Sequence, residues 1–325
     1  MLWPERSSLN RQVLDCNVLQ SLSKFLNSTT VLAIVACLLW SSAFAGIKIG
    51  LQYTPPLQFA GIRFMLAGLM ILPFCGNLSV YLRDVVDHHK TVVLVSFFQT
   101  TLLYILFYPG LNMLPAAIGA IITGSQPLII AVIAHFVAAS ERMTAKRVFS
   151  IFLGLAGVVI ISLNRGEMTL SGGSQFLGLL LLLFSSVSAG VGDLIVSRNK
   201  APIPPLTLTS SQLFLGGFVL FLISIPVEGV QGRSYPAAYY GSLLWLSFLS
   251  AASFSIWFKL LKREGVVVSD LNIWKFLIPV SGACLSWVLL PGESPEFSAV
   301  AGMICIALAL LTLNVAKKGH SFLHR

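Results

Sequence analysis

Two charged residues stand inside long apolar runs of this chain. Asp193 lies in SSVSAGVGDLIVSR and Lys275 lies in DLNIWKFLIP. A charge surrounded by hydrocarbon is costly, so such residues usually face a cavity or each other. We therefore expect Asp193 and Lys275 either to form an ion pair or to line one end of a path for a polar solute. The alternative is that both side chains reach a polar surface, which the long lysine does more easily than the short aspartate.

Other side chains could bind an anion or an aromatic ring. Arg63, in AGIRFMLAG, is expected to line an outer vestibule that favours anions or to form a structural ion pair, whereas Lys48 is better placed to reach lipid headgroups. Trp40, Tyr104 and Trp274 could stack against a solute, although aromatic residues in apolar segments more often serve packing. These residues point to solute binding, and we assign no catalytic residue.

A proline and a glutamate recur at the same spacing in the two halves of the chain. Pro127 precedes Glu141 by 14 residues, and Pro279 precedes Glu293 by 14 residues. Proline removes a helical hydrogen bond, so each is expected to kink an apolar helix and expose carbonyl groups to a solute path. The glutamates more simply mark where these helices end. The shared spacing indicates a duplicated sequence.

The composition excludes a soluble domain. Of 325 residues, 56% are hydrophobic and 10% are charged, and the mean hydropathy is +0.86. The net charge of +9 comes from basic residues in short gaps between apolar runs, which indicates membrane topology rather than nucleic-acid binding. The five cysteines show no CxxC spacing, so we expect neither a metal site nor a disulfide framework.

The apolar runs predict an all-α integral membrane protein with ten transmembrane helices, because a span needs about 20 apolar residues and unpaired backbone is excluded from lipid. We place the spans near residues 30–49, 57–76, 92–111, 115–138, 147–164, 175–197, 206–227, 237–258, 268–290 and 297–316.

The basic residues orient these spans. Sixteen Lys and Arg residues lie at one set of span ends and four at the other, which places both termini in the cytoplasm. Because five spans per half is an odd number, the second half enters the membrane from the opposite face, and the two halves are inverted repeats. In such folds a substrate site lies between the repeats near the membrane midplane. The expected organisation is a cytoplasmic tail at 1–28, a first repeat at 29–165, a second repeat at 174–316 and a cytoplasmic tail at 317–325.

With these features in hand, the chain resembles the EamA-type transporters of the drug/metabolite transporter superfamily over residues 30–316. The similarity is carried by LLWSSAFAGIKIG, by AGIRFMLAG with its arginine, and by the long stretch YILFYPGLNMLPAAIGAIITGSQPLIIAVIAHFVAASERMT. The second half resembles the family less, with Val187 and Ser188 where a tryptophan is common. The resemblance implies a multi-pass protein of the cytoplasmic membrane that moves small organic solutes, often as an exporter.

The expected function is therefore secondary transport, as an exporter, of small organic metabolites such as amino acids by alternating access. The chain has no GxxxxGK[ST] motif for ATP and we expect no cofactor. Its expected partners are a small-molecule substrate and the lipid bilayer, and association into a homo-oligomer is left open. The alternatives are a channel, a lipid-carrier flippase or an integral membrane transferase, although the last lacks clustered carboxylates. Coupling to protons through Asp193 or His135, to an exchanged solute, or to neither also stays open.

Overall fold

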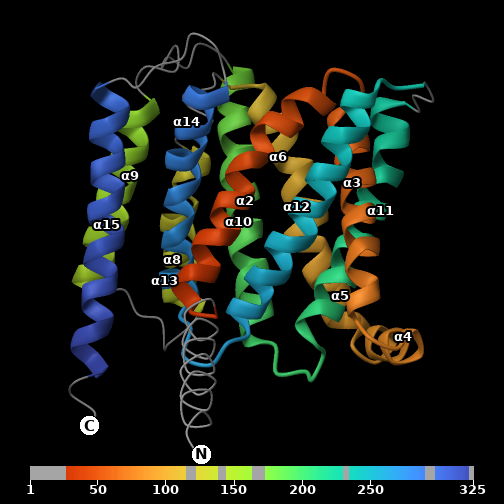
Figure 1. The fold of residues 1–325 in the computed structure, drawn as a ribbon, viewed down its shortest axis with the longest axis horizontal. Helices are drawn as coiled ribbons and strands as arrows, with labels where there is room; N and C mark the ends of the chain where they lie inside the picture. Colours follow the sequence, from red (N-terminus) through yellow and green to blue (C-terminus); the bar gives the residue numbers. More distant parts are fainter. Residues whose placement is uncertain are drawn as a thin grey trace, which may run out of the picture.

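The computed structural model describes residues 27–114, 122–137, 144–162, 173–229, 234–289 and 297–321. Throughout these ranges the secondary structure consists of α-helices with short 3₁₀ and π turns, and no strand occurs in them. The prediction of an all-α protein is confirmed for the described chain. Figure 1 shows the helices standing side by side as one bundle, apart from the short helix α4 at one end.

The helices in the first half of the chain are α2 (Thr29–Gly50), α3 (Pro56–Ile71) with η1 (Leu72–Phe74), α4 (Leu78–Asp87), α5 (His89–Ser96), η2 (Phe97–Thr101), α6 (Leu102–Asn112), α8 (Gln126–Val137) and α9 (Ala145–Ser162). Those in the second half are α10 (Gly173–Arg198), α11 (Pro205–Glu228), α12 (Ala237–Leu261), α13 (Val268–Ile273), η4 (Trp274–Phe276), α14 (Leu277–Leu289) and α15 (Phe297–Ser321).

Five helical stretches of the described chain are long and apolar enough to cross a membrane: Pro56–Phe74, His89–Asn112, Gly173–Arg198, Pro205–Glu228 and Ala237–Leu261. Their ends lie within a few residues of the corresponding predicted spans. Shorter apolar helices occupy Thr29–Ala43, Gln126–Val137 and Val300–Ala309. A chain with this many long apolar helices is a membrane protein.

Helix α3 and helix α11 form the edge of the bundle at the right of Figure 1, and α9 and α15 form the opposite edge. At the right edge a Cβ on Gly61 would lie 2.9 Å from the carbonyl oxygen of Gly217. At the other edge a Cβ on Gly157 would lie 2.6 Å from the carbonyl oxygen of Gly302. Only glycine permits such close approach, so each edge is held by backbone-to-backbone packing. Between the edges α2 packs on α12, α6 on α10, and α8 on α10 and α13.

The helical path is interrupted immediately before each of the two repeated prolines. Pro127 is the second residue of α8, which follows a turn at Ser125, and Pro279 is the third residue of α14, which follows the 3₁₀ turn η4. A proline in the first turn of a helix loses no helical hydrogen bond, because its N–H would have no acceptor there. The breaks lie where the kinks were predicted, but the prolines stand in first turns and not inside a helix, so the expected loss of a helical hydrogen bond is wrong. Glu141 and Glu293 lie outside the described residues.

Helix α4 was not foreseen, because it lies between the second and third predicted spans, where no element was placed. The Asn77 side chain caps it by accepting from the N–H of Ser79 at 2.8 Å. Leu78, Val80 and Val86 are exposed on it. The hydroxyl of Tyr81 lies 3.3 Å from that of Ser210, which ties the helix to α11.

Candidate solute-binding site

Asp193 lies on a face of α10 that turns toward the protein. Ser185, Ala189 and Asp193 recur every fourth residue, and all three are buried. Small residues at this spacing let helices approach closely in lipid, which agrees with the burial of this stripe against protein. Asp193 stands five residues before α10 ends at Arg198, and Figure 1 shows α10 ending at the lower end of the bundle.

Four side chains donate to the Asp193 carboxylate. Oδ1 accepts from Gln99 Nε2 at 2.6 Å and from Trp257 Nε1 at 3.3 Å. Oδ2 accepts from Asn272 Nδ2 at 3.0 Å and from Lys275 Nζ at 3.4 Å. A buried carboxylate is tolerated only when it is paired and hydrogen-bonded, and this one has both kinds of partner. The predicted pairing of Asp193 with Lys275 is therefore present in the structure.

Lys275 is held between the carboxylate and two indole rings. Its Nζ atom lies 4.9 Å from the Trp257 ring centre and 5.7 Å from that of Trp40. The two rings meet edge to face, with 5.1 Å between their centres. An ammonium over an indole face is attracted by the ring quadrupole, and more strongly once water is removed. The lysine and aspartate side chains are 12% and 2% exposed, so little water competes for either charge.

A local irregularity positions Gln99. It lies in the π turn η2, which interrupts the helix between α5 and α6, and such turns often occur at functional sites. The amide also donates to the carbonyl of Ala189 at 3.3 Å. A Cβ on Gly192 would lie 2.5 Å from Gln99 Cγ, so the missing side chain at 192 makes room for the glutamine.

The break before Pro279 positions Asn272 and Lys275. Asn272 belongs to the six-residue helix α13 and also donates to the carbonyl of Val268 at 3.0 Å. Lys275 follows in η4, so both side chains reach Asp193 from one short, irregular segment. Pro279 is not among the donors to the carboxylate, but the segment that precedes its helix supplies two of the four.

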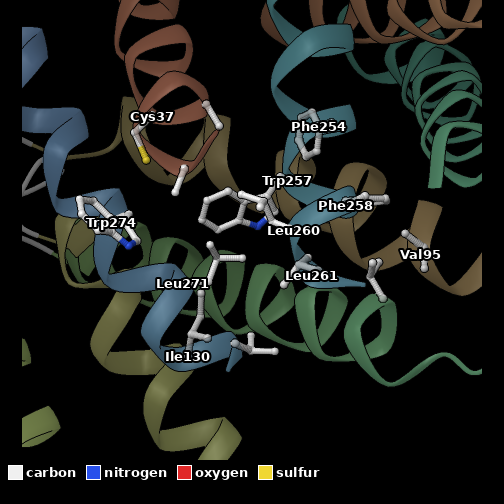
Figure 2. Close-up of a cluster of buried hydrophobic side chains, with 14 of the residues drawn as sticks. Cys37, Val95, Ile130, Phe254, Trp257, Phe258, Leu260, Leu261, Leu271 and Trp274 are labelled. Carbon is white, nitrogen blue, oxygen red and sulfur yellow. The ribbon is translucent and has the colours of Figure 1, made fainter. Parts of the chain in front are cut away.

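Trp257 reaches the carboxylate through an apolar layer. Figure 2 shows its indole extending from α12 among buried side chains that include Leu271 and Ile130. Apolar neighbours offer the indole N–H no acceptor, and a buried indole N–H usually finds one, which here is Asp193. Trp274 is also buried in this layer, and among the described aromatic residues it makes no ring contact. Its position favours a packing role over a contact between its ring and the Lys275 ammonium.

The sequence model of the EamA-like transporter family matches residues 27–163 and 176–315, nearly the whole of the described chain. The chain belongs to the EamA-like transporter family. The resemblance drawn from its motifs is confirmed.

Curated relatives of this EamA-like transporter are similar over most of its length. A probable amino-acid metabolite efflux pump of Salmonella typhimurium is 30% identical over 87% of this chain and 93% of that protein. The uncharacterized transporter YvbV of Bacillus subtilis is 26% identical over 89% of this chain and 92% of that protein. One solved crystal structure covers 89% of this chain and 97% of its own, with a TM-score of 0.74 and 18% identity, which supports the fold alone.

Sequence reasoning found the two charges of this site and Trp40, but it missed three of the four donors to the carboxylate, which are Gln99, Trp257 and Asn272. Gln99 and Asn272 are neutral amides near the ends of apolar runs, where such residues are ordinary. A polar residue within a span that needs a partner was the available signal. Among the described residues no three His, Cys, Asp or Glu side chains lie together to hold a metal ion.

A second group of predicted residues gathers away from the ion pair. Arg63 on α3 lies against Tyr104 on α6, with 5.5 Å between the guanidinium carbon and the ring centre. Pro127 and Pro279 belong to neither group, and a role for them in the solute path stays a prediction. The side chain of Lys48 lies outside what the structure describes.

Proposed function

We propose that this EamA-like transporter exports small organic metabolites such as amino acids across the cytoplasmic membrane by alternating access. In this proposal the chain makes ten spans in two inverted five-helix repeats, 29–165 and 174–316. Both termini lie in the cytoplasm. The Asp193–Lys275 pair then lies in the cytoplasmic half of the protein, between helices of both repeats.

The helix contacts support the inverted repeats. In chain order, α2, α3, α6, α8 and α9 of the first half correspond to α10, α11, α12, α13 with α14, and α15 of the second half. When each helix is replaced by its counterpart, the α2–α12 contact becomes the α10–α6 contact. The same exchange leaves α3–α11, α8–α13 and α9–α15 as they are. A pairing pattern that maps onto itself is what a two-fold axis between the halves produces.

The glycine packing supports the same axis. Gly61 faces Gly217, and a Cβ on Gly68 would lie 2.7 Å from the carbonyl oxygen of Ser210. The sequence offset from Gly61 to Ser210 equals the offset from Gly68 to Gly217, so the two contacts are equivalent under the exchange. The family match to residues 27–163 and again to 176–315 is consistent with this duplication.

The single observation that carries the function is a buried ion pair shared by five separate segments. Trp40 comes from α2, Gln99 from η2, Asp193 from α10, Trp257 from α12, and Lys275 from η4. A contact network that joins so many helices at one point closes the bundle there. Breaking it allows these helices to separate at that end.

An amino acid carries the charges needed to replace both members of the pair. Its carboxylate can accept from Lys275, and its ammonium can donate to Asp193, so neither buried charge is left without a partner. Opening the cytoplasmic half is then costly without a solute and less costly with one. The efflux-pump names of the Salmonella relative and of an Escherichia coli relative, 27% identical over 80% of this chain, favour substrates of this class.

Counterflow in proteoliposomes tests the proposal. Vesicles loaded with unlabelled amino acids should take up labelled ones in a saturable way, which a channel does not do. Asp193→Asn and Lys275→Met should each reduce the rate at least about tenfold, as expected when an interaction of a buried charge is lost. Arg83→Gln, at an exposed pair with Asp87, is the matched control and should leave the rate unchanged. Wild-type rates in both site variants would show that the ion pair does not control opening of the bundle. A wild-type protein without saturable uptake would contradict the proposed transport of amino acids.

One observation favours a second candidate, a lipid-carrier flippase. An apolar groove of ≈ 550 Å³ lies between α2, α12 and α14, lined by side chains that include Leu38, Trp245 and Leu285. Leu38 and Trp245 are exposed, so the groove faces outward, where lipid chains could enter. Movement of a fluorescent lipid between leaflets, unaffected by amino acids, would support the flippase over the exporter.

A further inference from the structure

A second buried cation lies in the bundle, apart from Lys275. Arg63 is the eighth residue of α3 and only 4% exposed. Its guanidinium carbon lies 4.4 Å from the Phe64 ring centre and 5.5 Å from that of Tyr104. Arg63 lies about 10 Å along α3 from Pro56, and Asp193 lies five residues before the end of α10. Figure 1 shows the start of α3 and the end of α10 at opposite ends of the bundle.

No carboxylate of the described chain lies within ion-pair distance of Arg63. Glu228, the acid at the end of the neighbouring helix α11, is otherwise engaged. Its two carboxylate oxygens each accept a backbone N–H at the start of α3, from Leu57 and Gln58, at 2.9 Å. The Tyr104 ring lies beside the guanidinium, but a neutral phenol cannot balance its charge. The arginine is thus buried without an anion to balance it among the described residues.

Two polar atoms of this cluster lack a hydrogen-bond partner. They are Nε of Arg63 and the hydroxyl oxygen of Tyr108, both buried. Tyr108 lies one helical turn after Tyr104 on α6, with 5.9 Å between the ring centres. Buried polar groups are rarely left unsatisfied, and those that are call for an explanation such as a missing ligand. Both residues contact Tyr104, and two donors without acceptors in one cluster call for an acceptor that the structure does not contain.

The chemistry of the donors specifies the ligand. A guanidinium presents N–H groups in a planar fork that matches the two oxygens of a carboxylate, and a phenol can add a third hydrogen bond. One arginine balances one negative charge, which favours a carboxylate over a phosphate dianion. Phe64 and the two tyrosine rings supply apolar walls around these donors.

We propose that Arg63 and Tyr108, with Tyr104 beside them, bind the carboxylate of the transported solute in the half of the bundle opposite the Asp193–Lys275 pair. This inference rests on the proposed function, because the site is covered in the structure and becomes accessible only as the helices separate. The solute then meets one cation at each end of its path. Its carboxylate passes from Lys275 to Arg63.

Thermal stability of the purified protein in detergent tests the site. The probes are L-amino acids, each compared with its own carboxamide, which keeps the side chain and amine but lacks the negative charge. We expect at least one acid to raise the melting temperature of the wild type by several degrees while its amide does not. In Arg63→Gln the binding of that acid should weaken by roughly tenfold or more. Arg83→Gln is the matched control, because Arg83 is exposed on α4.

Tyr108→Phe provides a variant that should fold normally. The hydroxyl has no partner in the structure, so its loss should leave the melting temperature without ligand unchanged, while the shift caused by the acid decreases. Binding of the acid at wild-type affinity by both Arg63→Gln and Tyr108→Phe would contradict the site. So would a wild type that binds and transports amides as well as acids, although transport itself would then stand. A protein that neither binds nor transports any member of the panel contradicts the proposed function as well.

Discussion

Lys275 Nζ lies 3.4 Å from Oδ2 of Asp193, yet the aspartate depends on the lysine less than the lysine depends on the aspartate. Three other side chains donate to the carboxylate, and one of them, Gln99, approaches to 2.6 Å. Among the described residues, Lys275 contacts only this carboxylate and two indole faces. The two charges of the pair are therefore unequally supported.

This inequality predicts a ranking of stability. Lys275→Met leaves a carboxylate with three donors, whereas Asp193→Asn leaves a buried ammonium without a counter-charge and turns an amide N–H₂ toward other donors. Removing one partner of a buried pair lowers the free energy of unfolding by about 3–5 kcal/mol. We expect a loss near the upper end of that range for Asp193→Asn and a smaller loss for Lys275→Met. Thermal unfolding in detergent measures the order, and an inverted order would contradict the unequal support.

The same geometry predicts that exchanging the two charges does not rescue the pair. In Asp193→Lys with Lys275→Asp, the new lysine would face the donor groups of Gln99, Trp257 and Asn272, which need an acceptor. The stability and the transport rate of this double variant should both remain below those of Asp193→Asn and of Lys275→Met. The reciprocal exchange of Arg83 and Asp87, an exposed pair 3.7 Å apart, is the control and should be close to neutral. A charge exchange at 193 and 275 that restores the wild type would mean that the three neutral donors contribute little.

Gly192→Ala should weaken the network without changing any of its members. The added methyl would stand 2.5 Å from Gln99 Cγ, so the glutamine must move away from Asp193. We expect a loss of about 1–3 kcal/mol, the cost of leaving a buried acceptor short of a partner. Gly241→Ala in α12 is the control, because nothing lies within 4 Å of its new methyl and alanine favours helix. Equal melting temperatures for the two variants would count against a role for Gln99.

How much of this site the sequence could predict depends on the type of residue. Asp193 and Lys275 were identifiable because a charge in an apolar run must find a partner, and each was the other's best candidate. Gln99 was not, because its position depends on a π turn that leaves no sequence signature. Tertiary contacts between distant residues were equally hidden. Arg147 was counted as a residue that orients the chain, although in the structure it pairs with Asp270, 123 residues away.

The Arg147–Asp270 pair makes its own prediction. The guanidinium Nε lies 2.7 Å from Oδ1, and the side chains are 13% and 10% exposed, so the contact is largely protected from water. It joins the start of α9 to α13, the helix that supplies Asn272. Arg147→Gln should lower stability by about 1.5–3 kcal/mol and reduce transport by loosening α13. Arg147→Lys keeps the charge but loses the planar fork, so its stability should lie between that of the wild type and that of Arg147→Gln. An Arg147→Gln variant as stable as the wild type would show that the pair contributes nothing to stability.

The backbone contacts at the two edges of the bundle limit which parts of the protein can move. Gly61 on α3 touches Gly217 on α11, and Gly157 on α9 touches Gly302 on α15, so neither pair of helices can slide without collision. Each pair takes one helix from either half of the chain. A half of the sequence is consequently not a unit of motion. In the proposed transport cycle, each body that shifts would therefore contain helices from both halves, and the connections between the bodies would have to bend at several places at once.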